Sequence, residues 1–257
     1  MNIDLYTLCW NEIKIIPFVI QYWENIKNQV DLFHAYVYDN GSNDGSIEEL
    51  SKYDWITVRH FDSDGINELA YLQIKNNAWK ESRGKADFVI VCDMDECLYT
   101  KDFKKLFEDM KKENISLCTP KWLEMYSKEF PIYNGKLLHM QITKCKGTNA
   151  DVGTSKTIIF NPNKIKEINY VVGAHQCNPI GEIKMLNSNN TFIMHYKHLS
   201  IDYVLNRYKK CAERLSLINK RMGWGYHYAL SEDENRKNFD KEYNECINVN
   251  DILNEEN

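Results

Sequence analysis

The sequence has no long apolar run, no basic leader and no surplus of positive charge. No stretch approaches the roughly 18 consecutive apolar residues that a membrane helix requires, so we expect no membrane span. The first six residues, MNIDLY, lack the basic and apolar regions of a signal peptide and are typical of a first strand. A net charge of -5 argues against a nucleic-acid binder, because such proteins carry a basic surface. We therefore expect a cytoplasmic protein that binds no nucleic acid.

No Cys-x-x-Cys pair occurs among the eight cysteines, which lie mostly inside apolar runs. In a cytoplasmic chain this pattern predicts reduced, buried thiols rather than disulfides. Internal repeats and low-complexity linkers are also absent from the sequence. With 257 residues and 43% hydrophobic content, the chain has enough apolar material for one sizeable domain.

Residues 2–119 alternate between strand-like and helix-like patterns. Strand-like runs occupy residues 2–9, 33–38, 55–61, 87–92 and 116–119, and helical spacing of apolar residues covers 12–28, 65–83 and 102–112. Such alternation predicts a mostly parallel sheet with crossover helices on both faces. The run DFVIVC at 87–92 is continuous, as expected for a strand buried on both faces. Ligands of such sheets bind beyond the carboxyl ends of the strands, which is where the polar loops 39–46 and 93–96 lie.

The pattern changes from residue 120 onward. Short apolar runs separated by Gly, Asn and Pro predict antiparallel strands and long loops. Ser200 is expected to cap an amphipathic helix over residues 201–218, whose opposite face carries Arg207, Lys209, Lys210 and Arg214. We interpret this basic face as solvated, with contact to anionic lipid headgroups as the alternative. The last 25 or so residues are polar and acidic and are expected to be loosely ordered.

Two acidic residues directly follow the apolar run at 87–92. In an extended segment residues i and i+2 point to the same side, so Asp93 and Asp95 of Asp93-Met94-Asp95-Glu96 can meet one hard cation. Mg2+ and Mn2+ favour such oxygen ligands, and an ion held there leaves positions open for a diphosphate. Two solvated carboxylates at a loop are the simpler explanation, but the place after a buried strand favours a metal site.

Two further polar segments follow the first two strands. The loop 39–46 is a tight turn that caps the following helix in its plainest interpretation. Asp39, at the strand tip, is also a candidate acceptor of a hydrogen bond from a nucleobase or a ribose. Asn11 and Glu12 either cap the first helix or, with Thr7, face a nucleotide from the neighbouring strand.

In this order and spacing, Asn11-Glu12, Tyr38-Asp39-Asn40-Gly41-Ser42-Asn43-Asp44-Gly45-Ser46 and Asp93-Met94-Asp95-Glu96 resemble the family-2-type glycosyltransferases of the GT-A fold. The similarity is to the subgroup with an Asp-x-Asp-Glu motif and a late His-Tyr, here His195-Tyr196, and it covers roughly residues 3–215. It implies a Rossmann-like α/β domain that binds a nucleotide sugar. We assign this domain to residues 1–222, with a nucleotide-binding half at 1–119 and an acceptor-binding half at 120–222, followed by a tail at 223–257.

The resemblance also implies roles for individual residues. Asp39 would contact the base, and Glu12 would lie near the base or the ribose. Asp93 and Asp95 would bind the ribose and Mn2+ or Mg2+, with Asp95 the more direct ligand. His195 would complete the metal site, because imidazole is a good ligand beside carboxylates. A partly buried histidine satisfied by its neighbours is the alternative for this position.

Other candidate binding residues are less marked. Lys156 follows a glycine-containing loop and can offset phosphate charge, although a solvated lysine is the commoner outcome. Gln73 and Asn77, four residues apart on one helix, either line the sugar pocket or form the wet side of that helix. His175 lies in a glycine-flanked loop that suits acceptor binding, and it also competes with His195 for the metal.

The catalytic base and the acceptor site are expected in the second half. An inverting transferase needs a carboxylate base near the acceptor hydroxyl, and Glu124 and Asp151 lie where acceptor loops are expected. Neither has a distinguishing context, and a retaining mechanism would need no such base. Trp122 and Trp224 are candidate faces on which an acceptor sugar stacks, with packing in the core as the alternative.

These residues predict a metal-dependent glycosyltransferase of the hexosyltransferase type. It would move a sugar from a UDP-sugar to a saccharide or lipid-linked saccharide in bacterial surface polysaccharide synthesis, with peripheral contact at the inner face of the membrane. A sugar nucleotidyltransferase is disfavoured, because those enzymes carry a glycine-rich loop after the first strand and residues 8–12 have no glycine. A non-catalytic carbohydrate- or partner-binding module on the same fold is the other alternative.

Overall fold

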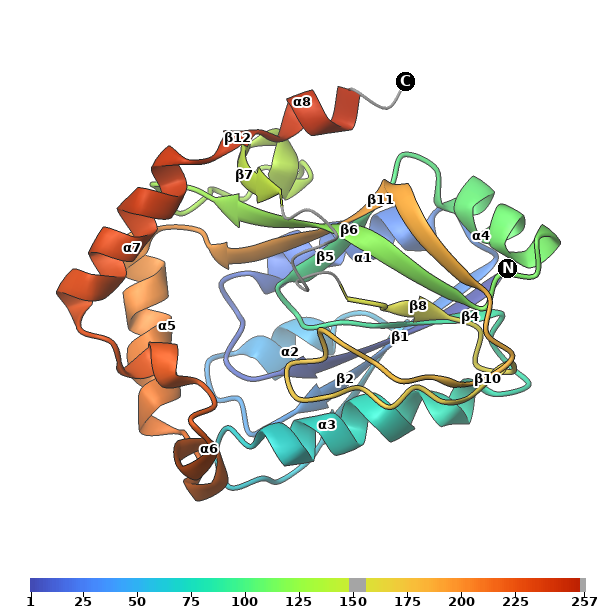
Figure 1. The fold of residues 1–257 in the computed structure, drawn as a ribbon, viewed down its shortest axis with the longest axis horizontal. Coiled ribbons are helices and arrows are strands. Elements are labelled where there is room, and N and C mark those ends of the chain that lie inside the picture. The colour runs from blue at the N-terminus through green and yellow to red at the C-terminus, as the bar shows by residue number, and fades with distance from the viewer. Residues whose placement is uncertain (148–155, 255–257) are drawn as a thin grey trace.

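The computed structural model describes residues 1–147 and 156–254, which form a central sheet flanked by helices (Figure 1). The first half contains β1 (Asn2–Cys9), α1 (Ile16–Lys27), β2 (Leu32–Asp39), α2 (Ser46–Leu50), β3 (Ile56–His60), α3 (Glu68–Asn77), η1 (Ala78–Ser82), β4 (Phe88–Val91), β5 (Glu96–Tyr99) and α4 (Phe103–Lys112). The second half contains β6 (Leu117–Tyr126), η2 (Leu138–Met140), β7 (Lys144–Gly147), β8 (Ile159–Phe160), β9 (Ile165–Glu167), β10 (Ile180–Gly181), β11 (Met185–His198), α5 (Ile201–Glu213), α6 (Leu217–Met222), η4 (Tyr226–Ala229), α7 (Glu232–Asn244), β12 (Ile247–Asn248) and α8 (Val249–Asn254).

The larger sheet is mostly parallel in its first half, as the alternating pattern predicts. Its strands follow the order β12-β7-β6-β8-β4-β1-β2-β3, and β11 pairs with both β5 and β6. β1 runs parallel to β2 and β4, and β2 runs parallel to β3. These pairings bring the carboxyl ends of β1, β2, β3 and β4 to one edge. The predicted α/β class with a GT-A architecture is therefore confirmed.

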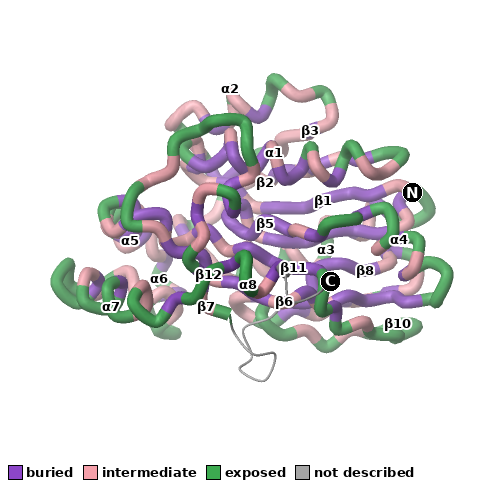
Figure 2. The backbone as a smooth tube through the Cα atoms, turned by 90° about the horizontal axis from the view of Figure 1, so that it is seen from above, coloured by how far each residue is buried: buried purple, intermediate pink, exposed green. Residues whose placement is uncertain are grey.

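β4 is buried on both faces of the sheet, as its continuous apolar run predicts. Figure 2 shows that β1, which pairs with it, is also largely buried. Phe88 and Ile90 belong to the core shared with α1 and α4, whereas Val89 and Val91 pack in the core around Trp79 of η1. Successive side chains of a strand point to opposite faces, so α1 and α4 cover one face and η1 covers the other. The loop after β4 is thereby fixed from both sides.

Several element boundaries differ from the expected ones. α1 begins at Ile16, because Asn11 adopts a left-handed backbone with φ of 55° and Pro17 stands in the first turn. The strand expected at 116–119 continues to Tyr126 as β6, which pairs in parallel with β11. Pro120 is accommodated there because the register between β6 and β11 shifts next to it, where no ladder hydrogen bond is required. Antiparallel pairing does occur between β6 and β7 and between β8 and β4.

The C-terminal segment is folded, in contrast to the loose order expected from its polar composition. Ser231 and Glu234 form a capping box at the start of α7, and Phe239 packs with Tyr126 in a small core. β12 extends the sheet by pairing with β7. Tyr243 packs against the same core and Glu242 pairs with Lys146, so two aromatic residues and an ion pair dock α7 once the capping box has fixed its start.

All eight cysteines are free thiols, and seven of them are buried, which confirms the expectation from their place in apolar runs. Among the described residues, no helix is long and apolar enough to cross a membrane.

One buried histidine, His139, makes the stability of the fold depend on pH. Its Nδ1 lies 3.0 Å from the hydroxyl of Tyr22, and burial lowers its pKa to about 4 from the ordinary value of 6.5. The unfolded chain therefore takes up this proton first as the pH falls. We expect the free energy of unfolding to decrease by up to about 3 kcal/mol between pH 6.5 and 4.

Urea denaturation at several pH values checks this expectation with the variant His139→Gln. The pKa of His227 is also lowered to about 4 by burial, so the variant removes only part of the total dependence. An unchanged slope of unfolding free energy against pH in His139→Gln would contradict the assignment.

Candidate active site

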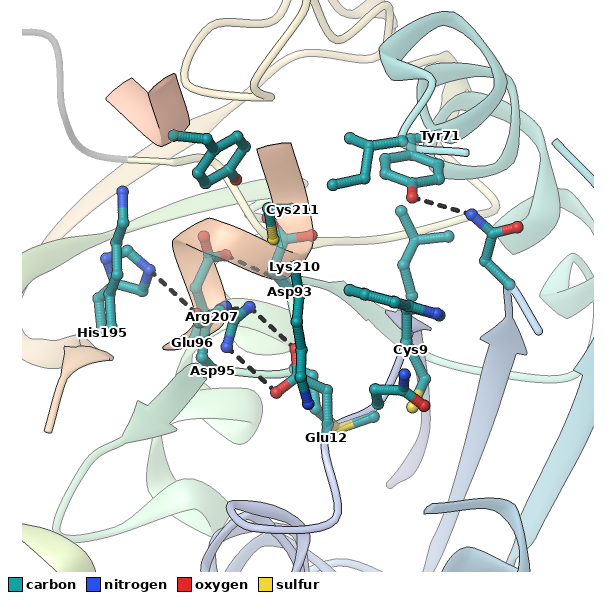
Figure 3. A pocket seen from close by; sticks show the side chains of 18 of the residues that line it. Cys9, Glu12, Tyr71, Asp93, Asp95, Glu96, His195, Arg207, Lys210 and Cys211 are labelled. Atoms are coloured by element: carbon teal, nitrogen blue, oxygen red, sulfur yellow. Dashed lines mark hydrogen bonds and ion pairs between the residues drawn. The ribbon is translucent and has the colours of Figure 1, made fainter. Parts of the chain in front are cut away.

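A cavity of about 500 Å³ lies at the carboxyl ends of β1 and β4. Its walls come from the loops after these strands together with α3, β6, β11 and α5, so segments far apart in the sequence meet there (Figure 3). One part of the wall is strongly charged and another is aromatic. Each part is built from residues that follow or flank the strands of the parallel sheet.

Asp93, the first acid of the motif, is held by two lysines. Its Oδ1 lies 2.6 Å from Nζ of Lys75, and its Oδ2 lies 3.0 Å from Nζ of Lys156. Burial opposes the ionisation of Asp93, but the two ammonium groups outweigh it and hold its pKa well below the ordinary value. Lys156 also donates to Glu96, whose Oε2 accepts from the backbone N–H of Asp93 at 3.1 Å. The predicted Lys156 therefore belongs to a buried cluster with two of the motif's carboxylates.

Asp95, the second acid, faces the late histidine and an arginine. Its Oδ2 lies 3.6 Å from Nε2 of His195 and 3.3 Å from Nη2 of Arg207. Although burial raises its pKa, these cations lower it by more, so Asp95 is an ionised carboxylate. Its backbone carbonyl accepts from the N–H of Tyr196 at 2.8 Å, which joins the acidic motif to β11. The structure thus brings together Asp95 and His195, as the sequence predicts.

Glu124 of β6 orients the His195 ring by contacting Nδ1, the ring nitrogen that does not face Asp95. This nitrogen lies 2.9 Å from Oε2 of Glu124, which also accepts from Nε1 of Trp122 at 3.0 Å. Burial opposes a charge on His195, but Glu124 and Asp95 raise its pKa to about 10. Nε2 of His198 lies 3.1 Å from the other Glu124 oxygen. Glu124 is therefore placed to position His195, and it does not line the cavity as an acceptor-facing base would.

Asp95 and His195 are of the residue types that hold a divalent metal ion, and His195 is braced by a carboxylate, as metal-binding histidines usually are. Because its pKa is raised to about 10, His195 is protonated and paired with Asp95, so an ion that bound there would displace this proton. Among the described residues no three His, Cys, Asp or Glu side chains form a metal-binding group. The protein would thus supply two ligands, Asp95 and His195, as for ions that take further ligands from substrate phosphates. Asp93 remains a predicted ligand whose two oxygens are engaged by lysines.

Arg207 of α5 closes one side of the charged wall. Its guanidinium forms a bidentate ion pair with Glu12, in which Nη2 lies 2.9 Å from Oε1 and Nη1 lies 3.1 Å from Oε2. This pair is in addition to its contact with Asp95. Burial raises the pKa of Glu12 to about 8, with Asp95 and Asp44 adding to the rise and Arg207 opposing it. The basic face of α5 is therefore not simply solvated, because Arg207 and Lys210 line the cavity.

The part of the cavity beside the loop after β1 is aromatic. It is lined by Leu8, Trp10, Phe61, Ile66 and Tyr71. The guanidinium of Arg214 lies 4.0 Å from the centre of the Trp10 ring and donates to the carbonyl of Asn40 at 3.1 Å. Nη1 of Arg214 is buried and has no hydrogen-bond partner among the described residues. Arg214 itself does not line the cavity, so this part offers a ligand mainly aromatic and apolar surface.

Asp39 turns toward its own loop. Its carboxylate accepts from the backbone N–H groups of Gly41 at 3.0 Å and Ser42 at 3.1 Å, and it does not line the cavity. This is the turn-capping interpretation of loop 39–46, and contact of Asp39 with a base stays a prediction. Asn11 does line the cavity, and its Oδ1 accepts from the backbone N–H of Asn43.

Four other predicted residues do not line the cavity. Thr7 is buried, and its hydroxyl lies 3.4 Å from the carbonyl of the next residue. The face of α3 that lines the cavity carries Glu68, Tyr71 and Lys75, which are spaced by three and four residues. Gln73 and Asn77 lie on another face of this helix, where they are exposed and hydrogen-bonded to each other. Trp224 is half-buried outside the cavity. Asp151 lies outside the described residues.

The two predicted acceptor residues nearest the metal site are both in the wall. His175 lines the cavity, with its ring centre 5.6 Å from that of Trp122. Trp122 is only 3% exposed, and His195 and Lys156 also pack on its ring. Trp122 therefore supports these charged side chains and has little surface left for a sugar.

Reasoning from the sequence missed five cationic residues that line the cavity, namely Lys14, Lys75, Lys197, Arg207 and Lys210. Arg207 and Lys210 share a stripe of α5 with Cys211, at spacings of three and four residues. This stripe lies next to the apolar stripe of the same helix. Its position could have indicated that the cationic residues form a second face of α5, the one that lines the cavity.

The chain is similar to known proteins in sequence and in fold. The sequence model of "Glycosyl transferase family 2" matches residues 5–168, more than half of the chain. No curated protein matches the chain. Among solved structures it is similar to TarS of S. aureus, with 13% identity, a TM-score of 0.45 and coverage of 81% of this chain and 40% of TarS. A TarS fragment, residues 1–349, crystallised with UDP-GlcNAc, has 14% identity, a TM-score of 0.44 and coverage of 83% of this chain and 66% of the fragment. The chain thus spans less than half the length of the longer TarS chain.

Proposed function

The chain belongs to glycosyl transferase family 2, and from this premise we propose that its cavity binds a nucleoside-diphosphate sugar, in the first place a UDP-sugar. The sugar would pass to a saccharide or lipid-linked saccharide acceptor in the synthesis of a bacterial surface polysaccharide. The observation that carries the proposal is the division of the cavity into an aromatic part and a charged part. A ligand with a flat base joined to a diphosphate has the same division.

The aromatic part suits the nucleobase. Trp10 and Tyr71 line it with ring surface on which a base would stack. Arg214 does not line the cavity, but its guanidinium lies 4.0 Å from the centre of the Trp10 ring and would hold that ring in place.

The charged part suits the diphosphate and its metal ion. Asp95 and His195 would hold Mn2+ or Mg2+, which when bound supplies positive charge to the diphosphate oxygens. Arg207 and Lys210 line the same cavity and would stabilise the negative charge that develops on the departing nucleoside diphosphate. Glu124 would keep the His195 ring in place through Nδ1, so that Nε2 stays directed at the metal.

Calorimetric titration with UDP and Mn2+ tests this proposal. We expect UDP to bind about tenfold or more tightly with Mn2+ than without it, because an ion held by Asp95 and His195 would offset the negative charge of the phosphates. Slow release of UDP from one of a panel of UDP-sugars should accompany binding. Absence of binding by UDP in both conditions would show that the cavity serves another ligand.

A further inference from the structure

Three large apolar side chains are exposed within ten residues at one end of the molecule, in α6 and η4 (Figure 1). Leu217 is 67% exposed, Met222 is 56% exposed and Tyr226 is 72% exposed. We call the segment Leu217–Ala229 the α6 tip. Single exposed apolar residues are ordinary, but several of them on one short segment indicate a surface that contacts another protein or a membrane.

The α6 tip is fixed in place, so its outward side is a defined surface. Asn219 is 1% exposed, and its Oδ1 accepts from the backbone N–H of Glu68 at 3.0 Å. The N–H of Ile66 donates to the carbonyl of Arg214 at 2.7 Å just before the tip. In a helix, residues two positions to either side of Asn219 point away from it. Leu217 and Arg221 therefore stand together on the side that faces away from the protein.

The charge of this region is opposite to that of the rest of the chain. The α6 tip carries two basic residues, Lys220 and Arg221, and no acidic residue, a net charge of +2, which leaves -7 on the remainder of the chain. Both basic side chains are exposed. An acidic protein with one basic, apolar end is attracted to an anionic surface only through that end.

We propose that the α6 tip docks on an anionic lipid bilayer. Lys220 and Arg221 meet the phosphate headgroups, while Leu217 and Tyr226 enter the boundary between headgroups and acyl chains, in the manner of interfacial segments. A second copy of this chain is a poorer occupant of the same surface, because two tips of equal charge repel each other. The remaining acidic surface is repelled by the bilayer, which fixes the orientation of the molecule.

This orientation places the cavity next to the bilayer. Ile66, Lys210 and Tyr228 line the cavity and belong to the segments that anchor or flank the α6 tip. If the proposed glycosyl transfer is right, the acceptor is thus one carried on a membrane lipid. Docking itself does not depend on that function.

Sedimentation with vesicles tests the docking. The full chain should sediment with vesicles of phosphatidylcholine mixed with phosphatidylglycerol, should stay in solution with phosphatidylcholine alone, and should be released by high salt. Each basic residue near such a surface contributes about a fivefold change in affinity, so Lys220→Gln with Arg221→Gln should weaken binding about 25-fold. Leu217→Ser with Tyr226→Ser should also weaken it.

Matched controls replace similar residues elsewhere. Lys104→Gln with Lys112→Gln removes two exposed charges of α4, and Ile132→Ser removes a side chain that is 81% exposed. Both should leave vesicle binding unchanged. Equal loss in the controls, binding without lipid preference, or a Leu217-dependent dimer in lipid-free solution would overturn the proposal. UDP titration of the tip variants, expected to match the parent, separates failure of docking from failure of the proposed function.

Discussion

Asp95→Asn should reduce Mn2+-dependent hydrolysis of a UDP-sugar by at least about a hundredfold. The carboxylate is shared between His195 and Arg207, so its loss removes the charge that attracts the ion and leaves two cations facing each other. Removal of one preorganised electrostatic contact typically costs a factor of about 100 to 1,000 in turnover. Rates measured at saturating and limiting Mn2+ show whether the loss lies in ion binding.

Asp109→Asn is the matched control for this experiment. It removes the same charge from the exposed face of α4, where Asp109 pairs with Lys105. Its activity should equal that of the parent protein. If Asp95→Asn retained the parent's response to Mn2+, Asp95 would not be a metal ligand.

Lys156→Met should lower the free energy of unfolding by about 3–5 kcal/mol, the usual effect of breaking a buried ion pair. Nζ of Lys156 contacts both Asp93 and Glu96, and the side chain of Glu96 is 2% exposed. Burial already raises the pKa of Glu96, so without the ammonium group its carboxylate is buried as an uncompensated charge or takes up a proton. Urea denaturation at neutral pH measures the loss.

The double variant Lys156→Met with Glu96→Gln should recover a large part of the lost stability. It removes the charge that Lys156 compensates, while Lys75 continues to pair with Asp93. No recovery in the double variant would mean that the cost of Lys156→Met comes from altered packing on Trp122 and not from charge.

The pairing of Asp95 with His195 was predictable, because each residue carries a recognisable signal in its local sequence. Asp95 follows a strand that is recognisable from four consecutive apolar residues, and β4 is buried on both faces as expected. His195 stands in a His-Tyr pair just before a helix whose cap, Ser200, is also recognisable from the sequence. Each of these features depends on neighbours within about ten residues, which is the range over which periodicity and capping operate.

The cations of the site were not predictable in the same way. Whether Arg207 is solvated or buried depends on the approach of Glu12, which lies 195 positions away in the chain. Lys75 has no local feature that separates it from Lys80 on the same stretch, although only Lys75 reaches Asp93. The fold decides such long-range pairs, and local patterns carry no information about them.

The backbone hydrogen bond between Tyr196 and Asp95 affects which substitutions the site can tolerate. It joins two motifs separated by about one hundred residues, and it uses only main-chain atoms, which every substitution except proline at 196 preserves. The motifs therefore keep their relative position while their side chains are exchanged. Substitutions of the side chains at positions 95 and 195 therefore change the charge at this edge of the sheet and leave the hydrogen bond that connects the two motifs intact.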